Sequence, residues 1–67
     1  MSVRGPVVEF EVPEVSKETD KALLCVIEGK EVWIPKSQIH DDSEVFEEGH
    51  KGTLVISEWI AKEKELI

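Results

Sequence analysis

The sequence has little of what many common functions require. Of its 67 residues one is cysteine, none is tyrosine and only Arg4 is arginine. A single cysteine excludes an internal disulfide. Because Cys25 lies in the apolar run 22–27, we expect a buried side chain and not a nucleophile. The sequence has no glycine-rich phosphate loop, no nucleophile elbow and no usual metal-ligand spacing for His40 and His50. We therefore predict no enzymatic activity, no cofactor and no metal site.

Long hydrophobic segments are also missing. The longest uncharged apolar run covers residues 22–27, far short of the roughly 20 residues that a transmembrane helix needs. Residues 1–6 lack the apolar stretch of a secretion signal. We therefore expect an intracellular, cytoplasmic protein that does not bind membranes. The length allows one domain, 1–67, which we divide into a flexible N-terminus (1–6), a β-rich part (7–57) and a C-terminal helix (58–67).

The apolar residues that are present favour a sheet. Valine and isoleucine total 15 residues against 4 leucines, and β-branched side chains suit strands. Residues 8–12 alternate, which predicts a half-buried strand with Glu9 and Glu11 in water. Pro13 ends this strand, and the polar residues 14–20 predict a loop. The run 21–28 predicts a buried strand, and a turn at Glu28-Gly29 returns the chain along 30–34 as a hairpin.

The second half of the chain predicts a helical turn, a strand and a final helix. Residues 35–39 indicate one helical turn after Pro35, with Ile39 packed under the sheet, and residues 53–57 indicate another strand. Ser57 is placed to cap a final helix over 58–66, in which we expect Trp59 to be a core residue. The predicted fold class is α+β: a small antiparallel, strongly curved sheet or partly open barrel of three or four strands, closed by the C-terminal helix.

Negative charge is the strongest feature of the composition. Acidic residues outnumber basic ones 15 to 8, for a net charge of −7, and residues 41–50 alone contribute −5. This balance excludes a nonspecific nucleic-acid binder and makes direct nucleic-acid binding an unfavourable hypothesis. One interpretation is a solvated loop. The other is a surface that imitates a phosphate backbone and binds a basic protein, carried by Asp41, Asp42, Glu44, Glu47 and Glu48 and extended by Glu9 and Glu11.

Trp33 is a separate candidate binding residue. If its neighbours Val32 and Ile34 face the core, Trp33 faces outward. An outward tryptophan could stack on bases or anchor an interface. The alternative is that the C-terminal helix covers it.

One segment also carries a resemblance. Residues 31–39, EVWIPKSQI, together with 21–24 and 53–61, resemble a family of small uncharacterised proteins encoded by phages and prophages. The resemblance covers about residues 18–66 and leaves residues 1–17 outside. By similarity in size to phage accessory proteins, it implies an anti-defence protein of the anti-CRISPR kind, with no established activity for any residue.

These observations together lead to one functional hypothesis and two alternatives. The hypothesis is a non-catalytic, acidic, phage-type inhibitor that binds the basic nucleic-acid-binding surface of a host protein or ribonucleoprotein complex, such as a CRISPR–Cas effector, as a DNA mimic. The first alternative is an accessory module of phage nucleic-acid metabolism that binds single strands or a replication protein through the Trp33 face. The second is a small structural domain that forms homodimers.

Overall fold

The computed structural model describes residues 5–67, so the N-terminal segment predicted to be flexible lies mostly outside the described residues. The chain forms two antiparallel sheets, a 3₁₀ turn and one helix. In chain order the elements are β1 (Val7–Val12), β2 (Val15–Glu18), β3 (Ala22–Ile27), β4 (Lys30–Pro35), η1 (Lys36–Gln38), β5 (Gly52–Ser57) and α1 (Glu58–Glu63). The helix is not long and apolar enough to cross a membrane, and no other helix in residues 5–67 is.

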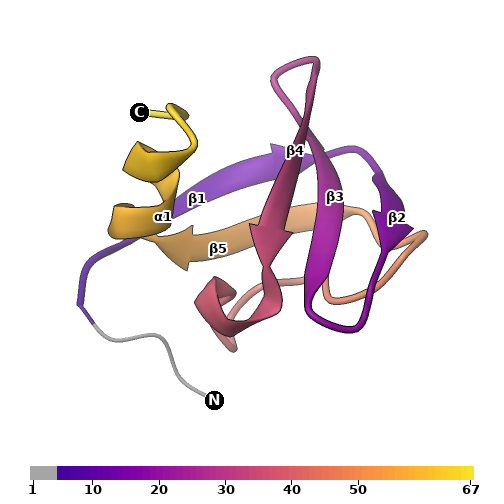
Figure 1. Cartoon of the computed structure of the whole chain (residues 1–67), viewed down its shortest axis with the longest axis horizontal. Coiled ribbons are helices and arrows are strands. Elements are labelled where there is room, and N and C mark those ends of the chain that lie inside the picture. The colour runs from indigo at the N-terminus through magenta and orange to yellow at the C-terminus, as the bar shows by residue number, and fades with distance from the viewer. Residues whose placement is uncertain (1–4) are drawn as a thin grey trace.

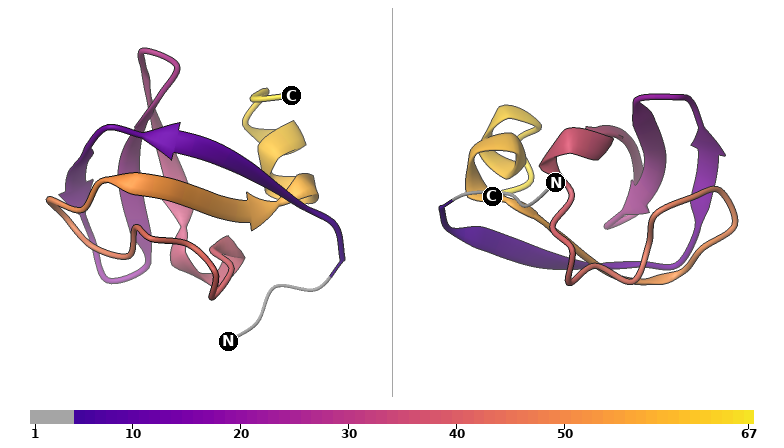
Figure 2. Two further views of the ribbon diagram at one scale, coloured as in Figure 1. Left: turned by 180° about the vertical axis from the view of Figure 1, so that it is seen from behind. Right: turned by 90° about the horizontal axis from the view of Figure 1, so that it is seen from below.

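The two sheets pack with their strands crossing. β1 pairs with β5 in one sheet, and the other has the order β2-β3-β4. Figure 1 shows β3 and β4 passing steeply in front of β1 and β5, and the view from below in Figure 2 shows the two layers with α1 at one end. Within residues 5–67 the sheets do not close into a barrel. The predicted α+β class, with an antiparallel sheet and a C-terminal helix, is confirmed.

The predicted strand number of three or four is wrong, because the segment 14–20 is not only a loop. Val15 is fully buried and lies opposite Cys25 in β3, which makes residues 15–18 a strand. The register shifts between Val15 and Lys17, as in a bulge. The polar residues after Val15 give this strand no clear hydrophobic alternation, so pairing with β3 decides its structure.

The hairpin of β3 and β4 is confirmed. Ile27 lies opposite Lys30, which leaves Glu28 and Gly29 as a two-residue turn. Both turn residues have positive φ, 51° and 80°, which is the geometry of a type I′ turn. β3 is buried on both faces, with Leu23, Cys25 and Ile27 in the core and Leu24 8% exposed on the outer face.

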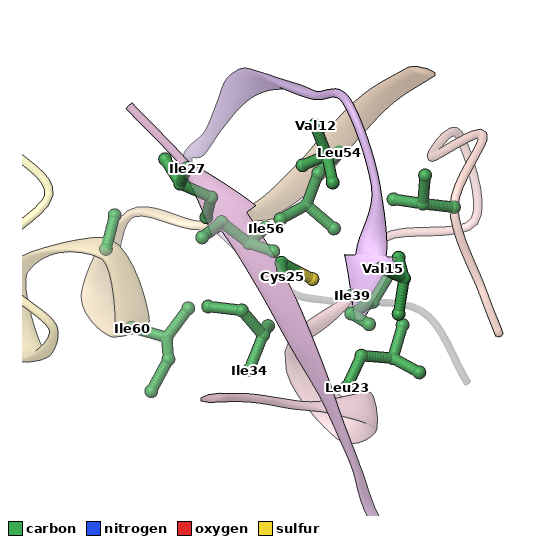
Figure 3. Packing of buried hydrophobic residues seen from close by; sticks show 12 residues of the cluster. Val12, Val15, Leu23, Cys25, Ile27, Ile34, Ile39, Leu54, Ile56 and Ile60 are labelled. Atoms are coloured by element: carbon green, nitrogen blue, oxygen red, sulfur yellow. The ribbon is translucent and has the colours of Figure 1, made fainter. Parts of the chain in front are cut away.

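The core fills the space between the two sheets, and every element except η1 contributes to it (Figure 3). The alternation predicted for β1 is confirmed, since Val12 is buried, Val8 and Phe10 are partly buried, and the two glutamates between them are exposed. The remaining core residues are Val15, Leu23, Cys25, Ile27, Ile34, Ile39, Val45, Leu54, Ile56, Ile60 and Ala61. Burial of the Cys25 thiol raises its pKa to about 11, which agrees with an inert apolar side chain.

Helix α1 begins as predicted and ends three residues early. The Ser57 hydroxyl accepts a hydrogen bond from the Ile60 N–H, as an N-cap does. At the other end Leu66 N–H bonds to the Ala61 carbonyl and Glu65 N–H to the Lys62 carbonyl. Glu65 has a φ of 58°. This is a Schellman motif, and it turns Leu66 back against the core.

The prediction that Trp59 is a core residue is wrong, because its side chain is 60% exposed. In the predicted helix, Trp59 and Ile60 would lie on one face with Leu66 and Ile67, seven residues later, and this shared face needs a helix that continues to residue 66. Since α1 ends at Glu63, only Ile60 and Ala61 on its inner face are buried. Ile67 is likewise exposed.

Candidate functional site

The acidic loop, which we define as residues 41–48, begins along the edge of β5 that β1 does not cover. Ile39 forms a bridge with Ile56, and the His40 N–H donates to the Val55 carbonyl. The Ser43 hydroxyl then donates to the same carbonyl at 2.8 Å and accepts from the Val55 N–H at 2.7 Å. Ser43 is only 7% exposed. One hydroxyl therefore replaces a strand residue as the partner of Val55 and protects this sheet edge.

Glu44 continues this edge with its side chain. Its N–H donates to the Thr53 carbonyl, and its Oε1 accepts from the Thr53 N–H at 2.9 Å. Gly52 has a φ of 132°, and a Cβ there would lie 2.6 Å from Glu44 Oε1, so the approach needs glycine. The Thr53 hydroxyl donates to Glu11 Oε1 at 3.2 Å. Two of the predicted site carboxylates, Glu44 and Glu11, therefore meet at Thr53.

The middle of the acidic loop separates two neighbouring apolar residues. Val45 is fully buried and joins the core, whereas Phe46 is 44% exposed. The Phe46 N–H donates to His50 Nδ1 at 3.1 Å, and the His50 N–H donates to the Glu47 carbonyl. Phe46 is thus an exposed aromatic side chain in the centre of a run of carboxylates. The two hydrogen bonds with His50 fix the backbone on which it stands.

The far end of the loop is attached to β2. The Val15 N–H donates to the His50 carbonyl and the Gly49 N–H to the Val15 carbonyl. Glu18 accepts the Glu48 N–H on one carboxylate oxygen and Lys36 Nζ, at 2.6 Å, on the other. The hydrogen bond from Lys36 lowers the pKa of the Glu18 carboxyl most, and the hydrogen bond from the Glu48 N–H lowers it further. One side chain of β2 therefore connects the loop with η1.

The two histidines serve this local structure. His40 Nδ1 accepts the Asp42 N–H at 3.0 Å, and Nδ1 of His50 accepts the N–H of Phe46. Asp42 Oδ2 also lies 3.6 Å from His40 Nδ1. Across residues 5–67 no three histidine, cysteine or acidic side chains are grouped as metal ligands would be.

Trp33 lies apart from these carboxylates. It stands directly opposite Leu24 on the outer face of the β2-β3-β4 sheet and is 41% exposed. Helix α1 packs against β1 and β5, so the alternative in which α1 covers Trp33 is wrong.

Glu9 and Glu11 lie on the outer face of the other sheet. Both are exposed, and they stand opposite Val55 and Thr53. The predicted site residues therefore form two surfaces.

A cleft of about 560 Å³ borders the acidic loop. The Lys36 N–H donates to the Lys21 carbonyl at 2.7 Å, which brings the start of η1 against the turn before β3. The lining residues are Asp20, Lys21, Pro35, Lys36, Ser37, Ile39, Asp41 and Phe46. Asp41 and Phe46 belong to both the cleft and the acidic loop.

Sequence reasoning missed Phe46, Ser43 and Glu18 as residues of this region. A single aromatic between carboxylates was the available signal for Phe46. No pattern marks Ser43 or Glu18, because their partners Val55 and Lys36 are 12 and 18 residues away. Comparison of the chain with known protein families, curated proteins and solved structures finds no match.

Proposed function

We propose that this protein is a non-catalytic binding module that docks its acidic loop on the basic, nucleic-acid-binding surface of a partner protein. The observation that carries the proposal is the arrangement of the loop: it is tied to β5 at one end and to β2 at the other, with Phe46 exposed between carboxylates. A solvated spacer would need neither attachment. An apolar anchor within a polar rim is the usual composition of a protein interface.

Holding the carboxylates in place favours binding in two ways. A loop that is ordered before the encounter loses less conformational entropy when it binds. Fixed negative charges also steer a basic partner and accelerate association. Carboxylates at fixed positions on a protein surface can occupy the places that phosphates take in a basic groove. The binding mode is therefore competition with nucleic acid.

The resemblance to phage-encoded proteins indicates which partners to test first. A host defence complex holds its nucleic acid in a basic channel, and an acidic protein seated there inhibits it. We therefore extend the proposal to an anti-defence inhibitor, with a CRISPR–Cas effector as one partner of this class.

The test compares two variants with the same net charge. The loop variant carries Asp42→Lys, Glu47→Lys and Glu48→Lys, whose native side chains are exposed; Glu44 stays because it holds Thr53. The control variant carries Glu14→Lys, Glu31→Lys and Glu63→Lys, all exposed and outside the loop. Each reversal adds two positive charges, so both variants move the net charge from −7 to −1.

Wild-type and both variants are used as bait in a nuclease-treated bacterial lysate, and each retained protein is purified. We expect a nucleic-acid-binding partner to bind the wild-type and control proteins and not the loop variant. Duplex DNA should displace the wild-type protein, and binding should weaken steeply with salt. Equal binding by the loop variant, or binding that DNA does not affect, would refute the proposal.

A second candidate function rests on Trp33. Its exposed ring, with Lys17 and Leu24 in register across the same sheet face, favours stacking on an unpaired base. The direct test is quenching of Trp33 fluorescence by a single-stranded oligonucleotide at low salt. Trp59→Phe serves as the background because Trp59 is also exposed. Unchanged fluorescence would eliminate direct strand binding.

A further inference from the structure

The cleft beside the acidic loop combines apolar side chains with acidic and basic ones. Pro35 and Ile39 line it, and the exposed Phe46 ring belongs to the same lining. Its volume of about 560 Å³ lies within the roughly 300–1,000 Å³ of pockets that take small ligands. It therefore has room for an apolar side chain together with its neighbours in an extended peptide.

The charges around the cleft favour a basic occupant. Lys36 is neutralised by Glu18 at 2.6 Å. Asp20, Lys21 and Asp41 also line the cleft. The acidic loop next to them adds the field of its remaining glutamates and Asp42. A segment with lysine or arginine beside its apolar residue complements this surface, and an acidic segment does not.

From this we infer that the cleft receives an extended segment of the partner protein, in which an apolar side chain packs on Pro35, Ile39 and Phe46 while flanking basic residues face the acidic loop. The inference rests on the proposed function and specifies the partner's chemistry. Phe46 makes the apolar contact, and the loop selects the basic flank. Selection by both features is stricter than charge alone, which any basic protein would satisfy.

The first experiment uses three blocked peptides as probes of the full-length ¹⁵N-labelled protein: Arg-Leu-Leu-Arg, Arg-Ser-Ser-Arg and Glu-Leu-Leu-Glu. We expect the first to shift the amide signals of Lys21, Ser37 and Phe46, with a dissociation constant of about 1 mM or tighter. The other two should produce smaller, non-saturating shifts. Equal responses to the two arginine peptides would overturn the inference, since charge would then suffice.

Two variants test the site itself. Ser37→Trp places an indole in the cleft from an exposed position without changing charge, and should abolish binding of Arg-Leu-Leu-Arg. Phe46→Ala should weaken it by about tenfold. Trp59→Ala is the matched control, since it removes another exposed aromatic away from the cleft, and should leave the affinity within about twofold. Normal binding of Arg-Leu-Leu-Arg by the Ser37→Trp variant would overturn the inference.

The two proposals fail separately. If Ser37→Trp binds the purified partner normally while the Asp42, Glu47 and Glu48 reversal does not, the proposed function stands and the cleft inference is overturned. If Ser37→Trp loses the partner while the loop reversal keeps it, the cleft is the docking site for the apolar side chain, and both charge mimicry and selection of a basic flank by the loop fail.

Discussion

The β3–β4 hairpin and the acidic loop are maintained in different ways. The hairpin is a regular ladder of six residue pairs closed by a two-residue turn, and its inner face is part of the core. The acidic loop has one fully buried side chain, Val45, and depends on side chains of Ser43, Glu44 and Glu18 that accept hydrogen bonds from backbone N–H groups. The hairpin therefore resists changes in charge, whereas single substitutions and acid can loosen the loop. The surface that we propose for partner binding therefore has the less redundant support of the two.

The largest effect that separates the regions is expected from truncation of their buried side chains. Ile34→Ala in β4 removes a fully buried side chain and should lower the free energy of unfolding by about 3 kcal/mol. Val45→Ala should cost about 2 kcal/mol because fewer methyl groups leave the same core. Urea denaturation followed by circular dichroism measures both. A cost below about 0.5 kcal/mol for Val45→Ala would mean that the loop is not anchored by the core.

Ser43→Ala tests the edge of β5. The change leaves the buried N–H of Val55 without its partner and weakens the bonding of the Val55 carbonyl, so we expect a loss of about 2 kcal/mol. Hydrogen exchange should accelerate at the Val55 amide and remain slow in the β3–β4 ladder. Ser37→Ala, at an exposed serine, is the control and should stay within about 0.5 kcal/mol. Equal effects of the two serines would contradict the role assigned to Ser43.

The turn of the hairpin offers a smaller change in the opposite direction. Glu28 has a φ of 51°, and asparagine followed by glycine is favoured in a type I′ turn. Glu28→Asn should raise the free energy of unfolding by about 0.5 kcal/mol. Glu28→Val should instead lower it by about 1 kcal/mol, since a β-branched residue is strained there. Thermal unfolding of the Glu28→Asn and Glu28→Val variants measures both changes. If both variants shift Tm in the same direction, the result would argue against this turn geometry.

The smallest expected effect is a pH-dependent change in stability that is confined to the acidic loop. The folded-state pKa of Glu18 is lowered, so its contribution to stability is present above the ordinary value of 4.5 and is lost as pH falls through the lowered value. Glu18→Gln should therefore reduce Tm at pH 7, and this deficit should shrink as pH falls below 4.5. Glu31→Gln, an exposed carboxyl on β4, is the control. A Glu18→Gln deficit that persists unchanged at pH 3 would contradict this assignment.

Sequence reasoning was most successful where structure depends on neighbours along the chain. The hairpin, the turn after Pro35, the Ser57 cap and the burial of Cys25 all follow from local patterns. It failed where distant contacts decide. β2 is a strand because Val15 reaches Cys25, and Trp59 is exposed because Ile60 and Ala61 are the residues of α1 that pack on the core.

The same division applies to the binding surface. The sequence by itself determined that most of the net charge gathers in residues 41–50, because charge is a property of composition. It also determined that the side chain of Trp33 points to the opposite face of the sheet from those of Val32 and Ile34, because side chains alternate along a strand. Only the tertiary structure decided that Glu44 and Glu11 meet at Thr53 and that Val45 is buried while Phe46 is exposed. These arrangements depend on hydrogen bonds and packing between elements far apart in the chain, and no local pattern encodes them.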